Sequence, residues 1–151
     1  MAARYGTGSI YFGILGVVTL AFGIADLIVT IGGDSFTWGI LEIPADMFRG
    51  GWGGLIVLFA GLFYLSGVKN LSEIHQLSKV VLGSILIWVI AGTDIFAMIT
   101  ESIPGGEEGS WFNTLDGFLG TYAPPYPPAI FLLPFSLVVV YYIYKRKEPP
   151  A

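Results

Sequence analysis

Two carboxylates, Asp26 and Asp94, lie inside stretches of the chain that are otherwise apolar. Residues 10–31 contain no charge other than Asp26, and residues 80–100 contain none other than Asp94. An ionisable side chain in the middle of a membrane helix costs roughly 2.5–3.5 kcal/mol on insertion scales, so such groups are paired or serve a function. These two carboxylates are therefore the first candidates for chemistry, and the chemistry they offer is the binding of a proton or a cation.

The elements that must position these carboxylates are long apolar segments. Only 12% of the 151 residues are charged, 54% are hydrophobic, and the mean hydropathy is +0.75. Soluble domains carry about 25% charged residues. Four nearly uncharged runs, at about 8–32, 50–68, 80–100 and 128–144, each approach the roughly 20 residues that cross a membrane. The sequence predicts a single all-α domain, an antiparallel bundle of four transmembrane helices with outer loops at 33–49 and 101–127.

The charges between these runs predict the orientation of the bundle. Six of the seven basic residues lie on one side, in the N-terminal segment, the 69–79 link and the C-terminal tail. Arg49 is the single basic residue of the other side. Because basic residues favour the cytoplasmic side, we expect a multi-pass protein of the cell membrane with both termini in the cytoplasm. The two long loops, which hold seven of the eleven acids, then face outward.

Two stripes of small residues mark the faces on which the helices pack. In the first run, small and polar residues recur at three- and four-residue steps and include Asp26, which therefore points into the bundle. A second stripe opens the next helix. Small residues allow helix backbones to approach closely in lipid. The glycines predicted to pack in this way are Gly13, Gly16, Gly23, Gly50, Gly54 and Gly61.

Arg49 is the expected counter-ion of the two carboxylates. At about 1.5 Å per residue, Asp26 and Asp94 both fall in the outer third of a core about 30 Å thick. Arg49 opens the second helix on that side, and its long side chain can reach the same depth. One carboxylate is then left over, to be protonated, paired with a cation or shared with a partner. Thr30 and Thr93 offer neutral oxygens to this cluster, or satisfy their own helix carbonyls. The first interpretation is a purely structural cluster that fixes helix register, and the alternatives are a transported-ion or proton site and a contact for a partner.

The outer loops and the helix ends carry further patterns. Apolar residues in 110–120 follow helical spacing, with Ser110 placed to cap, and predict an amphipathic helix lying in the outer interface. In the first outer loop, Phe36, Trp38 and Ile40 alternate with smaller residues, and Pro44 is placed to open a short helix. Pro134 predicts a kink in the last helix. The aromatic residues predicted to form belts at the membrane surfaces are Trp52 outside and Tyr141, Tyr142 and Tyr144 inside.

The composition argues against catalysis. With no cysteine and one histidine, His75 in the cytoplasmic link, the chain lacks thiol chemistry and a ligand set for haem or zinc. We expect no catalytic residue, no metal and no cofactor, and no nucleic-acid partner. The leading hypothesis is a non-catalytic subunit or interaction component of a membrane assembly, with the lipid bilayer and other membrane subunits or copies of itself as partners. The alternative is a small proton- or cation-coupled transporter or channel that uses Asp26 and Asp94.

Overall fold

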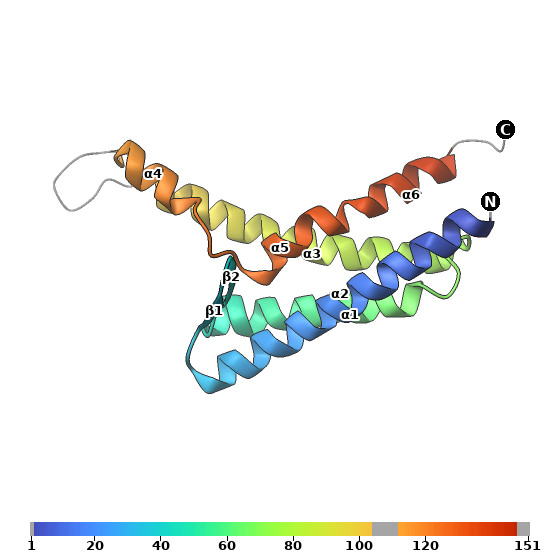
Figure 1. The fold of residues 1–151 in the computed structure, drawn as a ribbon, viewed down its shortest axis with the longest axis horizontal. Coiled ribbons are helices and arrows are strands. Elements are labelled where there is room, and N and C mark those ends of the chain that lie inside the picture. The colour runs from blue at the N-terminus through green and yellow to red at the C-terminus, as the bar shows by residue number, and fades with distance from the viewer. Residues whose placement is uncertain (1, 104–111, 148–151) are drawn as a thin grey trace.

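The computed structural model describes residues 2–103 and 112–147 and is mostly helical (Figure 1). A long first helix leads into a two-stranded hairpin, and a π-helix then runs directly into the second long helix. The elements in chain order are α1 Ala2–Gly32, β1 Phe36–Trp38, β2 Leu41–Ile43, the π-helix η1 Met47–Trp52, α2 Gly53–Gly67, α3 Ile74–Ser102, α4 Leu115–Thr121, α5 Pro128–Ser136 and α6 Val138–Lys147.

Four helical segments of the described chain are long and apolar enough to cross a membrane. They are Tyr5–Gly32, Met47–Gly67, Ile74–Ser102 and Pro128–Arg146. The prediction of an all-α membrane protein with four spanning helices is consistent with this arrangement. Each of the four spans extends beyond its apolar run at one end or both, and α3 already begins at Ile74. His75 therefore lies exposed in the first turn of a helix, and the prediction that it belongs to a loop is wrong.

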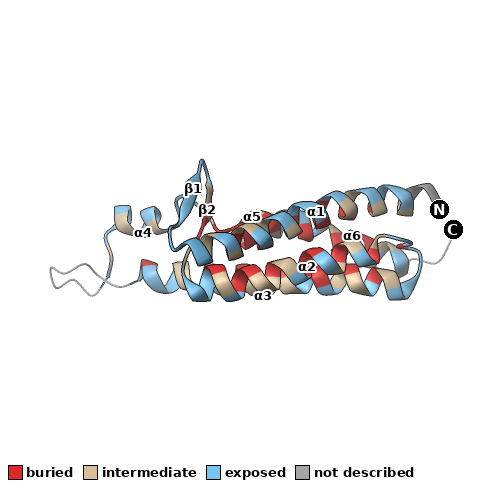
Figure 2. Cartoon of the chain, turned by 90° about the horizontal axis from the view of Figure 1, so that it is seen from below, coloured by how far each residue is buried: buried red, intermediate tan, exposed pale blue. Residues whose placement is uncertain are grey.

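The long helices lie side by side in chain order, α1 against α2, α2 against α3 and α3 against α5 (Figure 1). The start of α1 and the end of α6 lie at the same end of the molecule, here called the terminal end. The hairpin and α4 lie toward the opposite end, here called the hairpin end. Figure 2 shows that the buried residues line the faces that the long helices turn toward one another.

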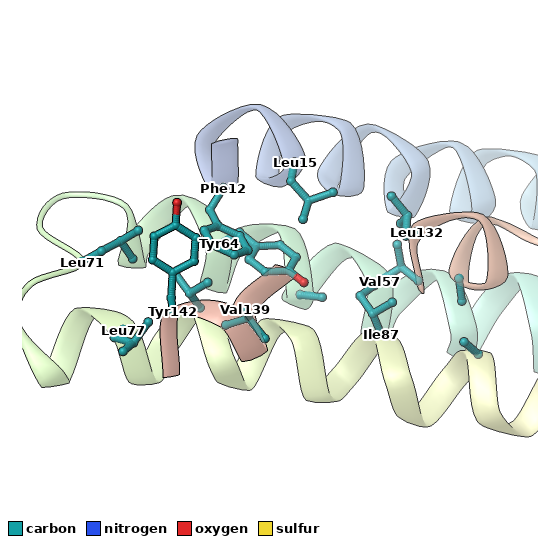
Figure 3. Packing of buried hydrophobic residues seen from close by; sticks show 14 residues of the cluster. Phe12, Leu15, Val57, Tyr64, Leu71, Leu77, Ile87, Leu132, Val139 and Tyr142 are labelled. Atoms are coloured by element: carbon teal, nitrogen blue, oxygen red, sulfur yellow. The ribbon is translucent and has the colours of Figure 1, made fainter. Parts of the chain in front are cut away.

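An aromatic cluster fills the core toward the terminal end (Figure 3). The Phe12 ring stacks on Tyr64 with centroids 5.8 Å apart and meets Tyr142 edge-on at 5.7 Å. Tyr142 is buried, so its assignment to an inner aromatic belt is wrong. The reason is Gly8, because a Cβ at that position would lie 2.6 Å from the Tyr142 ring. The absent side chain leaves room for Tyr142 to turn inward, while Tyr141 and Tyr144 are exposed.

A buried hydrogen bond links α2 to α3 within this core. Removing one of its two side chains should lower the free energy of unfolding by a different amount than removing the other. The Tyr64 and Ser84 hydroxyls are 2.9 Å apart, and Ser84 also donates to the Val80 carbonyl. Tyr64→Phe leaves Ser84 satisfied by Val80 and should lower the free energy of unfolding by about 0.5–1 kcal/mol. Ser84→Ala instead leaves the buried Tyr64 hydroxyl without a partner and should cost about 1–3 kcal/mol. Unfolding of both variants in mixed detergent measures the difference, and equal losses would contradict the assigned bond.

Two glycines with positive φ shape the connection between α1 and the π-helix. Gly33, at φ 82°, follows the last residue of α1 and donates its N–H to the Val29 carbonyl, as a left-handed residue does when it ends a helix. Gly39, at φ 61°, is the first residue of the two-residue turn that joins the strands, the position where a type II′ hairpin turn requires glycine. The alternation in this loop therefore forms a hairpin, and the next helix opens at Met47 rather than at Pro44.

The last span is interrupted. Pro134 lies inside α5, which ends at Ser136, and α6 resumes at Val138. Proline has no N–H to donate and its ring crowds the carbonyl four residues earlier, so a break here is expected. Between α3 and α5, the helix α4 begins at Leu115 after Thr114, whose hydroxyl accepts from the Gly117 N–H at 3.1 Å. The predicted cap, Ser110, lies outside the described residues.

Candidate functional site

Asp26 is held where α1 and α2 approach most closely. A Cβ added to Gly61 would lie 2.6 Å from the Leu20 nitrogen, and one added to Gly23 would overlap the Leu58 backbone. One turn toward the hairpin end, a Cβ at Gly54 would lie 2.5 Å from the Cβ of Asp26. The first turn of α2 therefore presents bare backbone to the Asp26 side chain.

The other predicted packing glycines divide into two groups. Gly16 lies against Tyr64, with its added Cβ 2.9 Å from the Tyr64 Cβ, and Gly50 lies against the Pro44 carbonyl and the Thr30 hydroxyl. Gly13 is different, because nothing lies within 4 Å of a Cβ placed there. The predicted packing role of Gly13 is therefore wrong for contacts within the described chain. At that turn of α1 the buried residues are Phe12 and Leu15.

Arg49 is positioned by the π-helix η1. Asp46 caps this helix, and its Oδ1 accepts a hydrogen bond from the Arg49 N–H at 2.6 Å. Gly50 and Gly51 follow directly, and Gly50 is buried. π-helical turns widen the backbone and are frequent at functional sites. Here the turn directs the Arg49 side chain toward α3.

The Arg49 guanidinium pairs with Asp94, which lies in the half of α3 nearer the hairpin end. Arg49 Nε lies 3.6 Å from Asp94 Oδ1, which makes an ion pair that is longer than a hydrogen bond. The two ends differ in exposure, since the Asp94 side chain is 9% exposed and that of Arg49 is 44% exposed. Asp94 is thus paired at long distance, and the Arg49 side chain remains partly exposed at the surface of the protein.

Asp26 has no such partner. It is 2% exposed, and its Oδ1 accepts no hydrogen bond from any residue that the structure describes. It lies against Gly54 at the start of α2, and Asp94 lines a cavity together with the adjacent Gly53. Of the predicted cluster, the structure therefore shows the Arg49–Asp94 pair, whereas Asp26 Oδ1 has no partner among the described residues.

The depth of this cluster follows from its contact with α2. Gly54 lies about 10 Å along the span that begins at Met47, at about 1.5 Å per residue. The membrane core is about 30 Å thick. Asp26 is thus about a third of the way in from the hairpin end.

The two threonines of the predicted cluster bond to helix carbonyls. Thr30 donates to the carbonyl of Asp26 at 2.8 Å, and Thr93 donates to that of Ile90 at 2.7 Å. Thr93 also lines a cavity of about 390 Å³ between η1 and α3, together with Arg49 and Asp94. The cavity walls are otherwise mainly apolar and include Trp52. One side of the ion pair therefore borders open space.

Two residues near the cluster, Asp46 and Thr19, were not predicted from the sequence to be part of it. Asp46 caps η1 by accepting from the N–H of Arg49, the residue that pairs with Asp94, and an Asp directly before a helical run is a recognisable capping signal. Thr19 is fully buried, and its hydroxyl, like Asp26 Oδ1, has no partner among the described residues. Its place in the small-residue stripe predicts burial, but no sequence signal marks the unused hydroxyl.

Comparison of the chain with protein-family models, with curated proteins and with solved structures finds no match. Within the described residues, no group of three or more histidine, cysteine, aspartate or glutamate side chains is arranged to hold a metal ion. Functional conclusions for the chain therefore rest on its own geometry, above all on the Asp26 cluster and on the surface of the hairpin end.

Proposed function

We propose that this chain is a non-catalytic membrane protein that acts as a subunit or interaction component of a membrane assembly. The observation that carries the proposal is an apolar, conformationally fixed surface at the hairpin end, here called the hairpin plate. It consists of Phe36, Trp38 and Ile40, all of which are exposed, and Trp38 is 75% exposed. Exposed apolar patches of this kind mark sites of interaction with proteins or membranes.

Backbone hydrogen bonds hold the hairpin plate in place. Its strands pair in the register Phe36–Ile43, Thr37–Glu42 and Trp38–Leu41. The segment before α5 then joins the hairpin, because Tyr126 donates its N–H to the Ile40 carbonyl at 2.7 Å and accepts from the Glu42 N–H at 2.9 Å. A surface that is ordered before binding loses less conformational entropy when a partner docks.

The side chains next to the hairpin plate are also apolar and enlarge the apolar surface. Met47 and Phe48, at the start of η1, are also exposed. Aromatic residues and methionine are enriched at protein interfaces relative to the rest of a protein surface. We favour a protein partner for this surface, either another membrane subunit or a second copy of the chain.

The distribution of charge supports an orientation with the hairpin plate outside the cell and both termini in the cytoplasm. Lys69, Lys79 and Arg146 belong to the ends of the helices at the terminal end, whereas Asp34 and Glu42 belong to the hairpin end. Basic residues favour the cytoplasmic side of a membrane. In this orientation α4, with exposed Leu115 and Leu119, is placed to lie in the outer interface, as the sequence predicts.

Trp38→Asp tests the proposal, because a charge at the centre of the plate should prevent docking without disturbing the exposed site itself. We expect the assembly extracted in mild detergent to fall, on native gels and in native mass spectrometry, to the 16.3 kDa chain with bound detergent. Leu115→Asp is the matched control, since it places the same charge on an exposed apolar residue of α4 at the same end. It should leave the assembly intact.

A photo-crosslinking amino acid at Trp38 identifies the partner in intact membranes. It should give one discrete protein adduct, whereas the same probe at the exposed Val89 of α3 should label lipid. A wild-type chain that is extracted as a monomer and yields only lipid adducts at Trp38 would overturn the proposal.

A further inference from the structure

We propose that Asp26 and Asp94 together bind one monovalent cation, either a proton or an alkali-metal ion. Asp26 comes from α1 and lies against Gly54, while Asp94 comes from α3 and lines a cavity with the adjacent Gly53, so both carboxylates lie beside the first turn of α2. The site is independent of the proposed role in an assembly, since it lies inside the bundle rather than on the hairpin plate.

The charges that face the site predict a single positive ligand. The α1 side contributes the Asp26 carboxylate and α3 contributes that of Asp94, while α2 offers only the uncharged backbone at Gly54. The η1 helix contributes the Arg49 guanidinium, and its cap Asp46 adds a further negative charge near Asp94. With Arg49 assigned to Asp94, the buried Asp26 remains as one uncompensated negative charge, and a buried charge of this kind is strongly unfavourable unless it is neutralised.

The unpartnered oxygen of Asp26 locates the ligand. Asp26 Oδ1 is fully buried and accepts no hydrogen bond from the described residues. Buried polar atoms in folded proteins are satisfied in the great majority of cases. A carboxylate oxygen kept free in this way, next to a second carboxylate, is the arrangement expected of a cation ligand or of a proton-accepting group.

The cavity between η1 and α3 gives the cation a route. It reaches Asp94 and Arg49, and the 3.6 Å separation of that ion pair allows Arg49 to remain near Asp94 while a cation enters. Arg49 is itself 44% exposed, so it can swing outward at little cost in solvation. The same cavity is lined by Gly53, and Asp26 lies against the next residue, Gly54.

The test measures the apparent melting temperature of the full chain in detergent against alkali ion and pH. A ligand that binds the folded state raises the melting temperature in a saturable way. At constant ionic strength, replacing choline with sodium or potassium should raise it by about 4 °C if the cation is an alkali-metal ion. If the cation is a proton, the same rise should appear between pH 8 and pH 5 without any dependence on alkali ion.

Asp26→Asn should abolish whichever response the wild type shows, because the amide has nearly the same shape and binds no cation. Thr19→Val is the matched control, since it changes a buried polar residue of the same face of α1 and should keep the response. Infrared difference spectra of the wild type provide a reading that does not require a folded variant, and cation exchange should shift a carboxylate band. A wild type without an alkali response, with the same pH response as Asp26→Asn, would overturn the proposal, as would flat difference spectra.

Discussion

Gly61→Ala should separate α1 from α2 and lower the free energy of unfolding by about 1–3 kcal/mol. The added methyl group would lie 2.6 Å from the backbone nitrogen of Leu20, and 2.8 Å from its Cα. Backbone atoms cannot rotate away as a flexible side chain does, so the two helices must move apart. That movement removes dispersion contacts along the most extensive helix interface of the bundle.

The reciprocal contact on α1 strengthens this expectation. Gly23 lies against the Leu58 backbone in the same way that Gly61 lies against Leu20, so each helix presents a glycine to the backbone of the other. Association of membrane helices depends on such close packing, because lipid tails are as apolar as the side chains and provide no hydrophobic driving force. Gly23→Ala should therefore cost as much as Gly61→Ala.

Gly13→Ala is the matched control, because Gly13 belongs to the same stripe of α1 but no atom lies within 4 Å of its added methyl group. Alanine at an open helical position should stabilise the helix by about 0.5–1 kcal/mol. The sign of the effect should thus reverse between Gly61 and Gly13. Unfolding by a denaturing detergent in mixed micelles gives both values. If Gly61→Ala proves as stable as Gly13→Ala, the close approach of the two helices is wrong.

The contrast between Gly61 and Gly13 also shows which structural features a sequence pattern can predict. Periodic small residues predict which face of a helix is packed, and Gly16, Gly23, Gly54 and Gly61 all lie on close contacts. The pattern contains no information on where two crossing helices diverge. Gly13 has the correct spacing, but Phe12 and Leu15 are the buried residues at that turn, and Gly13 is only half-buried beside them.

In the candidate site too, some features can be predicted from the sequence and others cannot. Apolar runs interrupted by single charges predict the membrane helices and the cluster of Asp26, Asp94 and Arg49 without any structural knowledge. The identity of the carboxylate that pairs with Arg49 depends on the π-helix and its Asp46 cap, which arise from local backbone geometry. The hairpin depends likewise on one turn residue, Gly39, and three-residue strands are too short to give a periodic signal.

Arg49→Leu should destabilise the protein by about 2–4 kcal/mol, because it leaves the Asp94 carboxylate buried without its counter-ion. Loss of one partner from a fully buried pair costs about 3–5 kcal/mol, and the 44% exposure of Arg49 lowers the expected value. Asp94→Asn should cost less, about 1 kcal/mol, since the exposed guanidinium can turn outward and remain solvated. The free energies of unfolding of the two single variants should therefore differ in this order.

The double variant Arg49→Leu with Asp94→Asn decides whether this loss comes from the unpaired charge. Asparagine removes the charge that the first substitution leaves uncompensated, so the double variant should be more stable than Arg49→Leu alone by at least about 1 kcal/mol. Such a reversal requires direct coupling, because independent sites add to within about 0.5 kcal/mol. Additive losses would instead mean that Arg49 stabilises the fold by packing its side chain against Trp52 and the other walls of the cavity. A reversal would show that Arg49, positioned by η1, stabilises the fold by neutralising the Asp94 carboxylate, whereas Asp26 has no counter-ion among the residues that the structure describes.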